Sequence, residues 1–236
     1  MIERAIVLAA GFGKRLQPLT NDVPKPLLKI NNVTLLENTL IFLKKIGVKY
    51  FAVNTHYLSD EIKYFCSTKK NLFDIQIFHE PEILGTGGGI RNAIDFFKDE
   101  NFIAINSDTL WSNEYINPFL NLFKNLVILK SKVGLLMVNK NKSFDKDLKG
   151  DFCMEKNSSY LKRGTDNNNN LIYTGCQIIS PSIFKREPNI NFSVHKIWDQ
   201  AISDKSMIGE IVDYTFYHAT NLSIYEKLKK LNIKCW

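Results

Sequence analysis

The sequence predicts an α/β protein whose core is a Rossmann-like, doubly wound mixed sheet in a single domain, residues 1–236. Three observations predict this class. Short apolar runs alternate with longer mixed segments through residues 1–130, the pattern of strands and helices that take turns. The run Ala5–Ala9 is continuously apolar, as expected for a parallel strand covered on both faces. A hydrophobic content of 44% supplies a sizeable core and excludes a disordered chain.

The first part of the chain, residues 1–130, is expected to form the core of the sheet. Thr34 and Glu37 form a capping-box pattern, and the leucines that follow recur at helical spacing until Gly47 ends the helix. The other elements predicted here are strands over 50–54, 75–78 and 102–105 and helices over 58–65 and 89–97. Ligands of such sheets bind beyond the carboxyl ends of the strands, so the loops after residues 9, 78 and 105 are where a site is expected.

The second part, residues 131–236, has a different pattern. Apolar runs over 133–138, 173–179 and 212–217 predict further strands, and residues 222–231 predict a terminal helix. Polar insertions over 139–150 and 164–170 lie between these strands, and the Asn167–Asn170 run is expected at a hairpin tip. We expect some of these strands to extend the sheet and others to form a small lid over the site.

Charge and cysteine content limit the partners and the compartment. The 31 Lys and Arg exceed the 24 Asp and Glu, but the basic residues are scattered and mostly lysine, which disfavours a nucleic-acid binder. No apolar run approaches the roughly 20 residues that a bilayer requires. The cysteines at 66, 153, 176 and 235 form no C-x-x-C pair, which predicts reduced, packing thiols in a cytoplasmic protein. We therefore predict no nucleic-acid and no membrane partner.

The loop after the first strand carries the most informative motif. It runs Leu8-Ala-Ala-Gly-Phe-Gly-Lys-Arg15, and a Pro24-Lys-Pro-Leu27 segment follows. A dinucleotide fingerprint would need a glycine at position 16, which is leucine, and a Walker loop would need Ser or Thr after the lysine, where Arg15 stands. Both motifs are therefore excluded. Glycines let backbone N–H groups approach anionic oxygens, and Arg15 and Lys25 add full charges. The loop predicts a polyphosphate ligand; a tight turn with solvated basic residues is the alternative.

The whole segment resembles the signature of the sugar-1-phosphate nucleotidylyltransferases, L-A-A-G-x-G-x-R-(L/M)-x-P-(L/M)-T followed by P-K-(P/A)-L. The resemblance covers essentially residues 1–231 and implies the nucleotide-diphospho-sugar transferase fold with a small sugar-binding lid. It implies that the glycine loop wraps a nucleoside triphosphate, that Arg15 grips the β- and γ-phosphates, and that Lys25 contacts the reacting phosphates. The loop residues implied to bind the nucleotide are Leu8, Ala9, Ala10, Gly11 and Gly13.

Further segments extend the resemblance. The turn from Glu80 to Gly89 is similar to the family's base- and sugar-binding turn, which implies nucleotide contacts by Glu80, Gly85, Thr86, Gly87 and Gly88. Asn106-Ser-Asp108 is similar to the family's Gly-Asp pair, with serine in place of glycine, and a carboxylate at the end of a central strand is well placed to hold magnesium. The implied catalytic residues are therefore Arg15, Lys25 and Asp108. The residues implied to face the sugar are Asn106, Asp151, Thr174 and Gly175.

One position departs from the family pattern. The resemblance implies a second metal-binding aspartate near the carboxyl end, and ungapped counting from Gly209-Glu210 places His218 there. Magnesium prefers oxygen ligands, so three interpretations stay open. Asp108 suffices with water and phosphate oxygens, a softer ion such as Mn²⁺ is used, or the protein has lost turnover. A strand-end histidine that binds no metal is the alternative for His218 itself.

The resemblance implies a cytoplasmic enzyme that transfers a nucleotidyl group from a nucleoside triphosphate to a sugar 1-phosphate and releases pyrophosphate, with Mg²⁺ or Mn²⁺ as cofactor. The turn at 80–90, the segment Gly150–Phe152 and Gly209-Glu210 are most similar to short bacterial enzymes that act on N-acetylmuramate 1-phosphate. The expected substrate pair is therefore UTP and this sugar, in peptidoglycan recycling. Mannose-1-phosphate guanylyl transfer, another substrate pair and non-catalytic nucleotide-sugar binding stay open as alternatives. A monomer or small homo-oligomer is expected.

Overall fold

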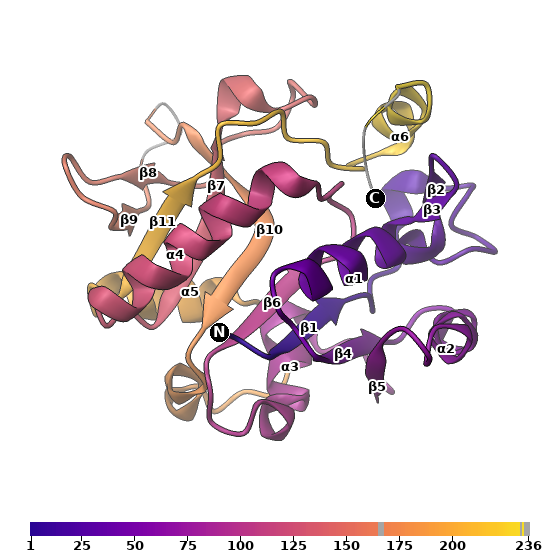
Figure 1. The fold of residues 1–236 in the computed structure, drawn as a ribbon, viewed down its shortest axis with the longest axis horizontal. Coiled ribbons are helices and arrows are strands. Elements are labelled where there is room, and N and C mark those ends of the chain that lie inside the picture. The colour runs from indigo at the N-terminus through magenta and orange to yellow at the C-terminus, as the bar shows by residue number, and fades with distance from the viewer. Residues whose placement is uncertain (165–167, 232, 234–236) are drawn as a thin grey trace.

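The computed structural model describes residues 1–164, 168–231 and 233, and a seven-stranded sheet in the order β11-β7-β10-β6-β1-β4-β5 forms its centre (Figure 1). Only β10 runs antiparallel to its neighbours in this sheet, so the sheet is mixed, as predicted. The strands of this sheet are β1 (Arg4–Leu8), β4 (Tyr50–Thr55), β5 (Asp74–His79), β6 (Phe102–Asn106), β7 (Val133–Asn139), β10 (Leu171–Ile179) and β11 (Met207–Ile211).

Helices cover both faces of the sheet. In Figure 1, α1 (Leu35–Lys45) and α4 (Ile116–Ile128) lie in front of it, whereas α3 (Gly85–Asn92) and α5 (His195–Ser203) lie behind it. Ile6 and Val7 on β1 point to opposite faces, because successive side chains of a strand alternate, and both are fully buried. This two-sided burial explains why the first strand is apolar from Ala5 to Leu8. The remaining helices are α2 (Ser59–Thr68) and α6 (Leu222–Lys229).

The predicted helix start at Thr34 is confirmed. The Thr34 hydroxyl accepts a hydrogen bond from the Glu37 backbone N–H at 3.0 Å, which satisfies one of the unpaired donors at the start of α1. Gly47 follows the helix with φ of 99°, a conformation that residues with a side chain rarely adopt. Local sequence signals therefore determine both ends of α1.

The predicted strand over 212–217 is wrong. The edge strand lies earlier, at β11, and the chain leaves the sheet at Val212. Val212 and Phe216 are each 1% exposed, so the alternating apolar residues anchor an irregular segment to the core and do not follow a strand ladder. The glycine and glutamate within Met207–Ile211 interrupt the apolar pattern, and this interruption concealed the true strand.

The predicted helix over 89–97 is only partly correct. The helix α3 begins at Gly85, so it contains the glycine run, and a separate 3-10 turn follows over Ile94–Phe97. Ala93 separates the two with φ −104° and ψ 13°. The helices α4 and α5 have no counterpart among the predicted elements.

Two short hairpins complete the fold: β2 (Lys29–Ile30) with β3 (Val33–Thr34), and β8 (Cys153–Met154) with β9 (Leu161–Lys162). The β8–β9 hairpin lies beside β11, where the Gly209 N–H donates to the Ser159 carbonyl at 2.8 Å. Its part in a sugar-binding lid stays a prediction. Asn167 of the predicted hairpin tip lies outside the described residues, whereas the Asn169 side-chain oxygen accepts from the Gly164 N–H at 2.8 Å.

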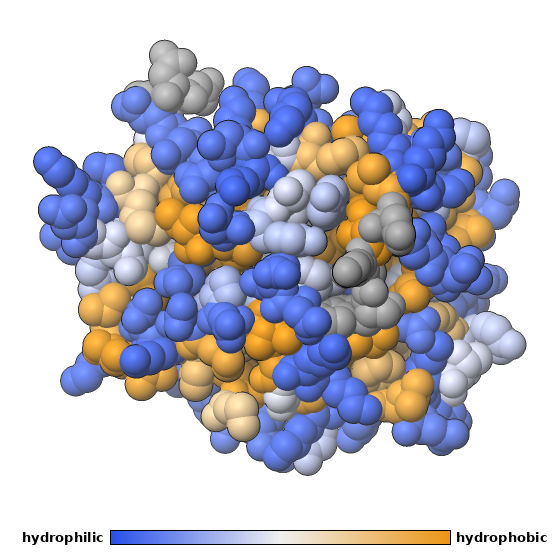
Figure 2. All heavy atoms as spheres, turned by 45° about the horizontal axis from the view of Figure 1, so that its top comes forward, coloured by the Kyte–Doolittle hydropathy of each residue, from blue (hydrophilic) through white to orange (hydrophobic). Residues whose placement is uncertain are grey.

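The surface seen in Figure 2 is covered by hydrophilic side chains, with smaller apolar areas between them. Among the described helices, none combines the length and the apolar character needed to cross a membrane. Three of the cysteines, Cys66, Cys153 and Cys176, are free thiols, and burial raises the pKa of Cys66 to about 12. The fourth, Cys235, lies outside the described residues.

Candidate functional site

A cleft of about 430 Å³ opens at the carboxyl ends of β1 and β6, where these two parallel strands lie side by side. The loops after β1 and β5, together with the end of β6, supply most of its lining, as the topology of an open α/β sheet predicts. The residues that line it are Leu8, Ala9, Ala10, Gly11, Gly13, Lys14, Arg15, Leu16, Lys25, Pro26, Asn54, Glu80, Ile83, Gly85, Thr86, Asn106, Ser107 and Asp108.

The turn at Gly13 directs the basic side chains toward this cleft. Gly13 has φ of 64°, and a Cβ there would lie 3.0 Å from the Thr20 methyl group, so both conformation and space require glycine. The Thr20 hydroxyl donates to the Gly13 carbonyl at 3.0 Å and fixes the turn. A 3-10 turn over Lys14–Leu16 follows directly, and Lys14 and Arg15 both line the cleft from it.

A buried polar network ties three loops of the cleft together. The Asn54 side-chain oxygen accepts from the Ala9 N–H at 2.7 Å, and its amide nitrogen donates to Glu80 Oε1, also at 2.7 Å. Glu80 is 0% exposed, and its second oxygen accepts from the Leu84 N–H at 3.0 Å. An unpaired buried carboxylate would be costly, so these bonds hold the loops after β1, β4 and β5 in one arrangement.

The glycine-rich turn divides between the cleft and the protein interior. Gly85 and Thr86 line the cleft, whereas Gly87 and Gly88 are buried, and both of their N–H groups donate to the Phe192 carbonyl at 2.9 and 3.1 Å. The segment 187–194 crosses this turn, and the Val194 N–H donates to the Thr86 hydroxyl at 3.0 Å. The described geometry thus places Gly87 and Gly88 against this segment, outside the cleft lining.

We expect Gly88→Ala to destabilise the protein by about 2–4 kcal/mol, because a Cβ at Gly88 would lie 2.2 Å from the Ile190 backbone carbonyl oxygen. Gly11→Ala is the matched control, since nothing lies within 4 Å of a Cβ at that position. Urea unfolding followed by circular dichroism measures both. Equal stability of the two variants would contradict the close approach of this segment to the glycine turn.

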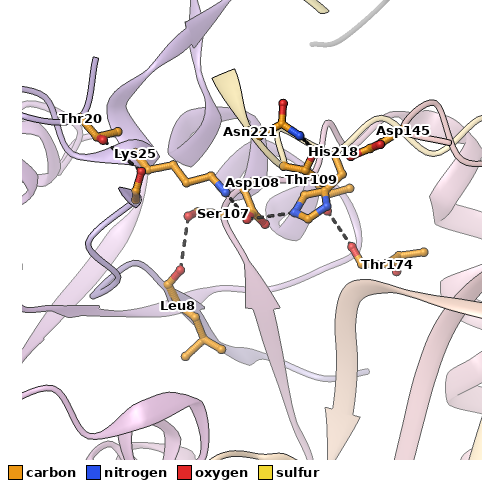
Figure 3. A network of polar contacts seen from close by, with 12 residues as sticks. Leu8, Thr20, Lys25, Ser107, Asp108, Thr109, Asp145, Thr174, His218 and Asn221 are labelled. Carbon is orange, nitrogen blue, oxygen red and sulfur yellow. Dashed lines mark hydrogen bonds and ion pairs between the residues drawn. The ribbon is translucent and has the colours of Figure 1, made fainter. Parts of the chain in front are cut away.

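Lys25 and Asp108, which both line the cleft, meet His218, which is not among its lining residues (Figure 3). Lys25 Nζ lies 2.6 Å from Asp108 Oδ2, and His218 Nε2 lies 2.9 Å from the same oxygen. The three side chains are 12%, 17% and 18% exposed, so water screens their charges only partly. Burial acts to raise the pKa of Asp108, but the charges of His218 and Lys25 outweigh it and hold this pKa well below its usual range. Asp108 is therefore an anion at neutral pH.

Backbone pairing brings His218 to Asp108, although the two residues lie far apart in the sequence. Thr109 and His218 form an isolated antiparallel bridge, the Leu110 N–H donates to the Tyr217 carbonyl, and the Ala219 N–H donates to the Asp108 carbonyl, the last two at 2.9 Å. The backbone thus holds whatever side chain stands at position 218 against the Asp108 carboxylate. The resemblance implied that both positions serve one metal site and so lie close together, but it did not predict a direct contact between their side chains.

The residues expected to face the sugar are only partly assembled around this cleft. Asn106 lines it, and Gly175, with φ of 96°, lies directly against Asn106. Asp151 is not among the residues that line the cleft, and its Oδ2 accepts from the Tyr173 N–H at 2.8 Å. The Thr174 side chain is buried and donates to the Leu136 carbonyl at 2.9 Å, and the Thr174 carbonyl accepts from the Thr109 hydroxyl at 2.6 Å, so Thr174 is bonded within the protein and does not line the cleft.

The donor set can accept a divalent cation through one protein oxygen. Asp108 Oδ1 is buried and has no hydrogen-bond partner among the described residues, so it offers a free carboxylate acceptor. Within the described part of the chain, no three His, Cys, Asp or Glu side chains gather in a way that could hold a metal by themselves. Mg²⁺ is commonly held by one or two carboxylates together with substrate phosphates and water, and Asp108 fits that chemistry.

Residues 4–144 match the family model described as nucleotidyl transferase. The chain belongs to this family. The resemblance predicted from the sequence is thereby confirmed, and this nucleotidyl transferase is an enzyme of the sugar-1-phosphate nucleotidyltransferase class. The match includes Arg15, Lys25, Glu80 and Asp108, whereas His218 lies outside it.

Relatives of this nucleotidyl transferase support the same class. N-acetylmuramate alpha-1-phosphate uridylyltransferase of Caulobacter vibrioides is 25% identical over 218 residues, 91% of this chain and 90% of the relative. D-glycero-alpha-D-manno-heptose 1-phosphate guanylyltransferase of Campylobacter jejuni is 34% identical over 127 residues, 54% of this chain and 57% of the relative. HddC of Yersinia pseudotuberculosis, solved in complex with GMP-PN, shares the fold with a TM-score of 0.73 at 22% identity, covering 97% and 99% of the two chains.

Several cleft residues of the nucleotidyl transferase were not identified from the sequence. Asn54 is the most important, because its side chain joins the loop after β1 to Glu80. An asparagine at the end of an otherwise apolar strand is the signal that could have pointed to it. Ser107, whose hydroxyl donates to the Leu8 carbonyl at 3.3 Å, joins the ends of β6 and β1 and had no expected role.

Proposed function

We propose that this enzyme transfers a uridylyl group from UTP to N-acetylmuramate 1-phosphate, forming the UDP-sugar and pyrophosphate. The observation that carries the reaction type is the convergence of Arg15, Lys25 and Asp108 on one cleft at the carboxyl ends of β1 and β6. The choice of substrates rests on the resemblance to N-acetylmuramate alpha-1-phosphate uridylyltransferases, 25% identical in Caulobacter vibrioides and 29% identical over 184 residues in Neisseria meningitidis. With this substrate the enzyme would serve peptidoglycan recycling.

The proposed roles follow from the charges around the cleft. The loop from Leu8 to Gly13 and the turn at Gly85 and Thr86 hold the nucleotide, with Glu80 fixing both loops from behind. Arg15 is exposed at the cleft. It neutralises the charge of the β- and γ-phosphates, which leave together as the pyrophosphate anion. Lys25 lies beside Asp108, where it can bring the two reacting phosphates together.

The proposed chemistry is a direct displacement. An oxygen of the sugar 1-phosphate forms a bond to the α-phosphorus of UTP, and the bond from that phosphorus to the bridging oxygen of the β-phosphate breaks. The attacking phosphate is already ionised, so no general base is required. Positioning of two anions and neutralisation of their charge supply most of the rate enhancement. The cleft meets this need with Lys14, Arg15 and Lys25.

We further propose that the reaction uses Mg²⁺, with Mn²⁺ as a substitute, and that Asp108 holds it. When bound, the ion would neutralise phosphate charge next to the reacting phosphorus. The unpartnered Asp108 Oδ1 supports this assignment. On the sugar side, Asn106 of the cleft lining is the first proposed contact, and Thr174, Gly175 and Asp151 are further proposed contacts outside that lining.

Guanylyl transfer is the second candidate. Over 127 residues, 54% of its length, the chain is 34% identical to a heptose 1-phosphate guanylyltransferase, a higher identity than to either uridylyltransferase. Mannose-1-phosphate guanylyltransferases, 29% identical over about 191 residues, extend this alternative to another sugar. A nucleotide-sugar-binding protein without turnover is the third possibility, and it rests on the histidine at position 218.

Pyrophosphate release from each pairing of UTP, GTP, CTP or dTTP with N-acetylmuramate, mannose or heptose 1-phosphate tests the proposal. We expect UTP with N-acetylmuramate 1-phosphate to give the highest kcat/KM, and omission of either substrate to abolish release. A GTP-dependent pair that exceeds it by tenfold or more would replace the proposed substrates. Binding of a triphosphate with no release from any pair would favour the non-catalytic alternative.

A further inference from the structure

His218 contributes a contact that the proposed chemistry does not require. Its Nε2 and Lys25 Nζ both bind the same oxygen of Asp108, Oδ2, and leave Oδ1 of that carboxylate without a partner among the described residues. The two contacts differ in origin, because Lys25 follows the loop after β1 and His218 lies on the segment after β11. Together they fix both the rotation of the carboxylate and the oxygen that it presents to a cation.

The position of His218 is a consequence of the backbone. The bridge at Thr109 and the two flanking hydrogen bonds to residues 108 and 110 pair the segments on either side, so a side chain at 218 has little freedom to move away. The ring also stacks on Phe216, with centroids 5.4 Å apart and an interplanar angle of 25°. This packing holds the imidazole in the orientation that directs Nε2 at Asp108.

The charge of this cluster determines its attraction for a divalent cation. A carboxylate at position 218 would lie beside Asp108 and form a pair of anions, an arrangement that is relieved by binding a hard cation. The imidazole adds no negative charge and binds the existing anion instead. Asp108 is therefore the single anion of the trio, and Lys25 already compensates it.

We propose that His218 is a positioning residue that fixes Asp108 through Oδ2, and that it restricts divalent cation binding to the nucleotide-bound enzyme. The free protein offers one carboxylate oxygen, and the phosphate oxygens of the nucleotide supply the remaining anionic ligands. The cation and the nucleotide then enter together. This inference rests on the proposed role of Asp108 in cation binding, but not on the identity of the base or the sugar.

Titration of the free, full-length protein with Mn²⁺, followed by electron paramagnetic resonance of the unbound ion, tests the proposal without any substrate. The control variant is His79→Asp, which adds a carboxylate at an exposed histidine outside the cleft. We expect the wild-type protein to bind no more Mn²⁺ than this control does. His218→Asp is expected to bind Mn²⁺ at least about tenfold more tightly, because ligand charge tunes affinity. Adding Asp108→Asn to it is expected to abolish this gain.

His218→Gln separates positioning from charge, since its amide can still donate to Asp108 and adds no anion. It is expected to resemble the wild type in the Mn²⁺ titration. Circular dichroism confirms the fold of each variant, and His218→Glu replaces His218→Asp if the latter does not fold. Two results would overturn the proposal: wild-type protein that binds Mn²⁺ as tightly as the carboxylate variant, or a folded carboxylate variant with no gain. Absence of turnover with every substrate would overturn the proposed function but leave this titration unaffected.

Discussion

Lys25→Ala is expected to lower kcat by about a hundredfold to a thousandfold, because it removes a fixed positive charge from the place where two anionic phosphates must meet. Lys25 Nζ is held 2.6 Å from Asp108 and is only slightly exposed, so neither water nor a mobile side chain can take over its charge. The loss should be larger in kcat than in the KM for the nucleotide, since the charge matters most as the phosphates approach. Steady-state pyrophosphate release measures both constants.

Lys14→Ala is the matched control for this variant. Lys14 lines the same cleft, but it is exposed, and its ammonium lies over the Phe12 ring at 5.3 Å. It is expected to change kcat by less than about tenfold. If the two lysine variants lose activity equally, the cleft acts through its overall positive field, and the specific role proposed for Lys25 is wrong.

Asp108→Asn is expected to reduce kcat by about a thousandfold while the protein stays folded. An amide of similar shape keeps the packing but removes the anion that binds Lys25 and His218 and that is proposed to hold the cation. We also expect a loss of about 1–3 kcal/mol of stability at neutral pH, as for hydrogen bonds to charged groups. Kinetic assays and urea unfolding in EDTA measure the two effects separately.

The stability difference between wild type and Asp108→Asn should depend on pH. The pKa of Asp108 in the folded protein lies below its unfolded value, so the stabilisation is fully present above the unfolded pKa of about 4. It is lost as the pH falls below that value, because the unfolded chain then binds the proton more readily. A stability difference that grows on acidification would contradict the ion pair.

The parts of the fold that sequence could predict are those with strong local signals. The first strand, the helix capped by Thr34 and the strands at 50–55, 102–106 and 133–139 each have continuous apolar runs or a cap, and they form as expected. The strand at 207–211 could not be recognised, because Gly209 stands there to accommodate the Leu161 side chain, 2.8 Å from a Cβ at that position. The glycine in this strand is therefore explained by a tertiary contact, which no local sequence pattern reveals.

The site was predictable to the extent that its motifs follow the ends of strands. The loop after β1 and the Asp108 position meet in one cleft because their strands are parallel neighbours. The contact between Asp108 and His218 depends on pairing of segments far apart in the chain, which no local pattern encodes. The glycine run predicts that another part of the molecule approaches its backbone closely. The segment that does so, at Phe192, lies more than a hundred residues away in the sequence.

The most direct test of nucleotidyl transfer follows the α-phosphorus. The enzyme is incubated with Mg²⁺, N-acetylmuramate 1-phosphate and UTP radiolabelled at the α-phosphate, and the products are separated by ion-exchange chromatography. We predict that the label moves into a nucleotide sugar with an equal amount of unlabelled pyrophosphate, and that Asp108→Asn prevents this. Label that leaves UTP only as UMP, or that appears as UDP with inorganic phosphate, would contradict transfer to the sugar phosphate.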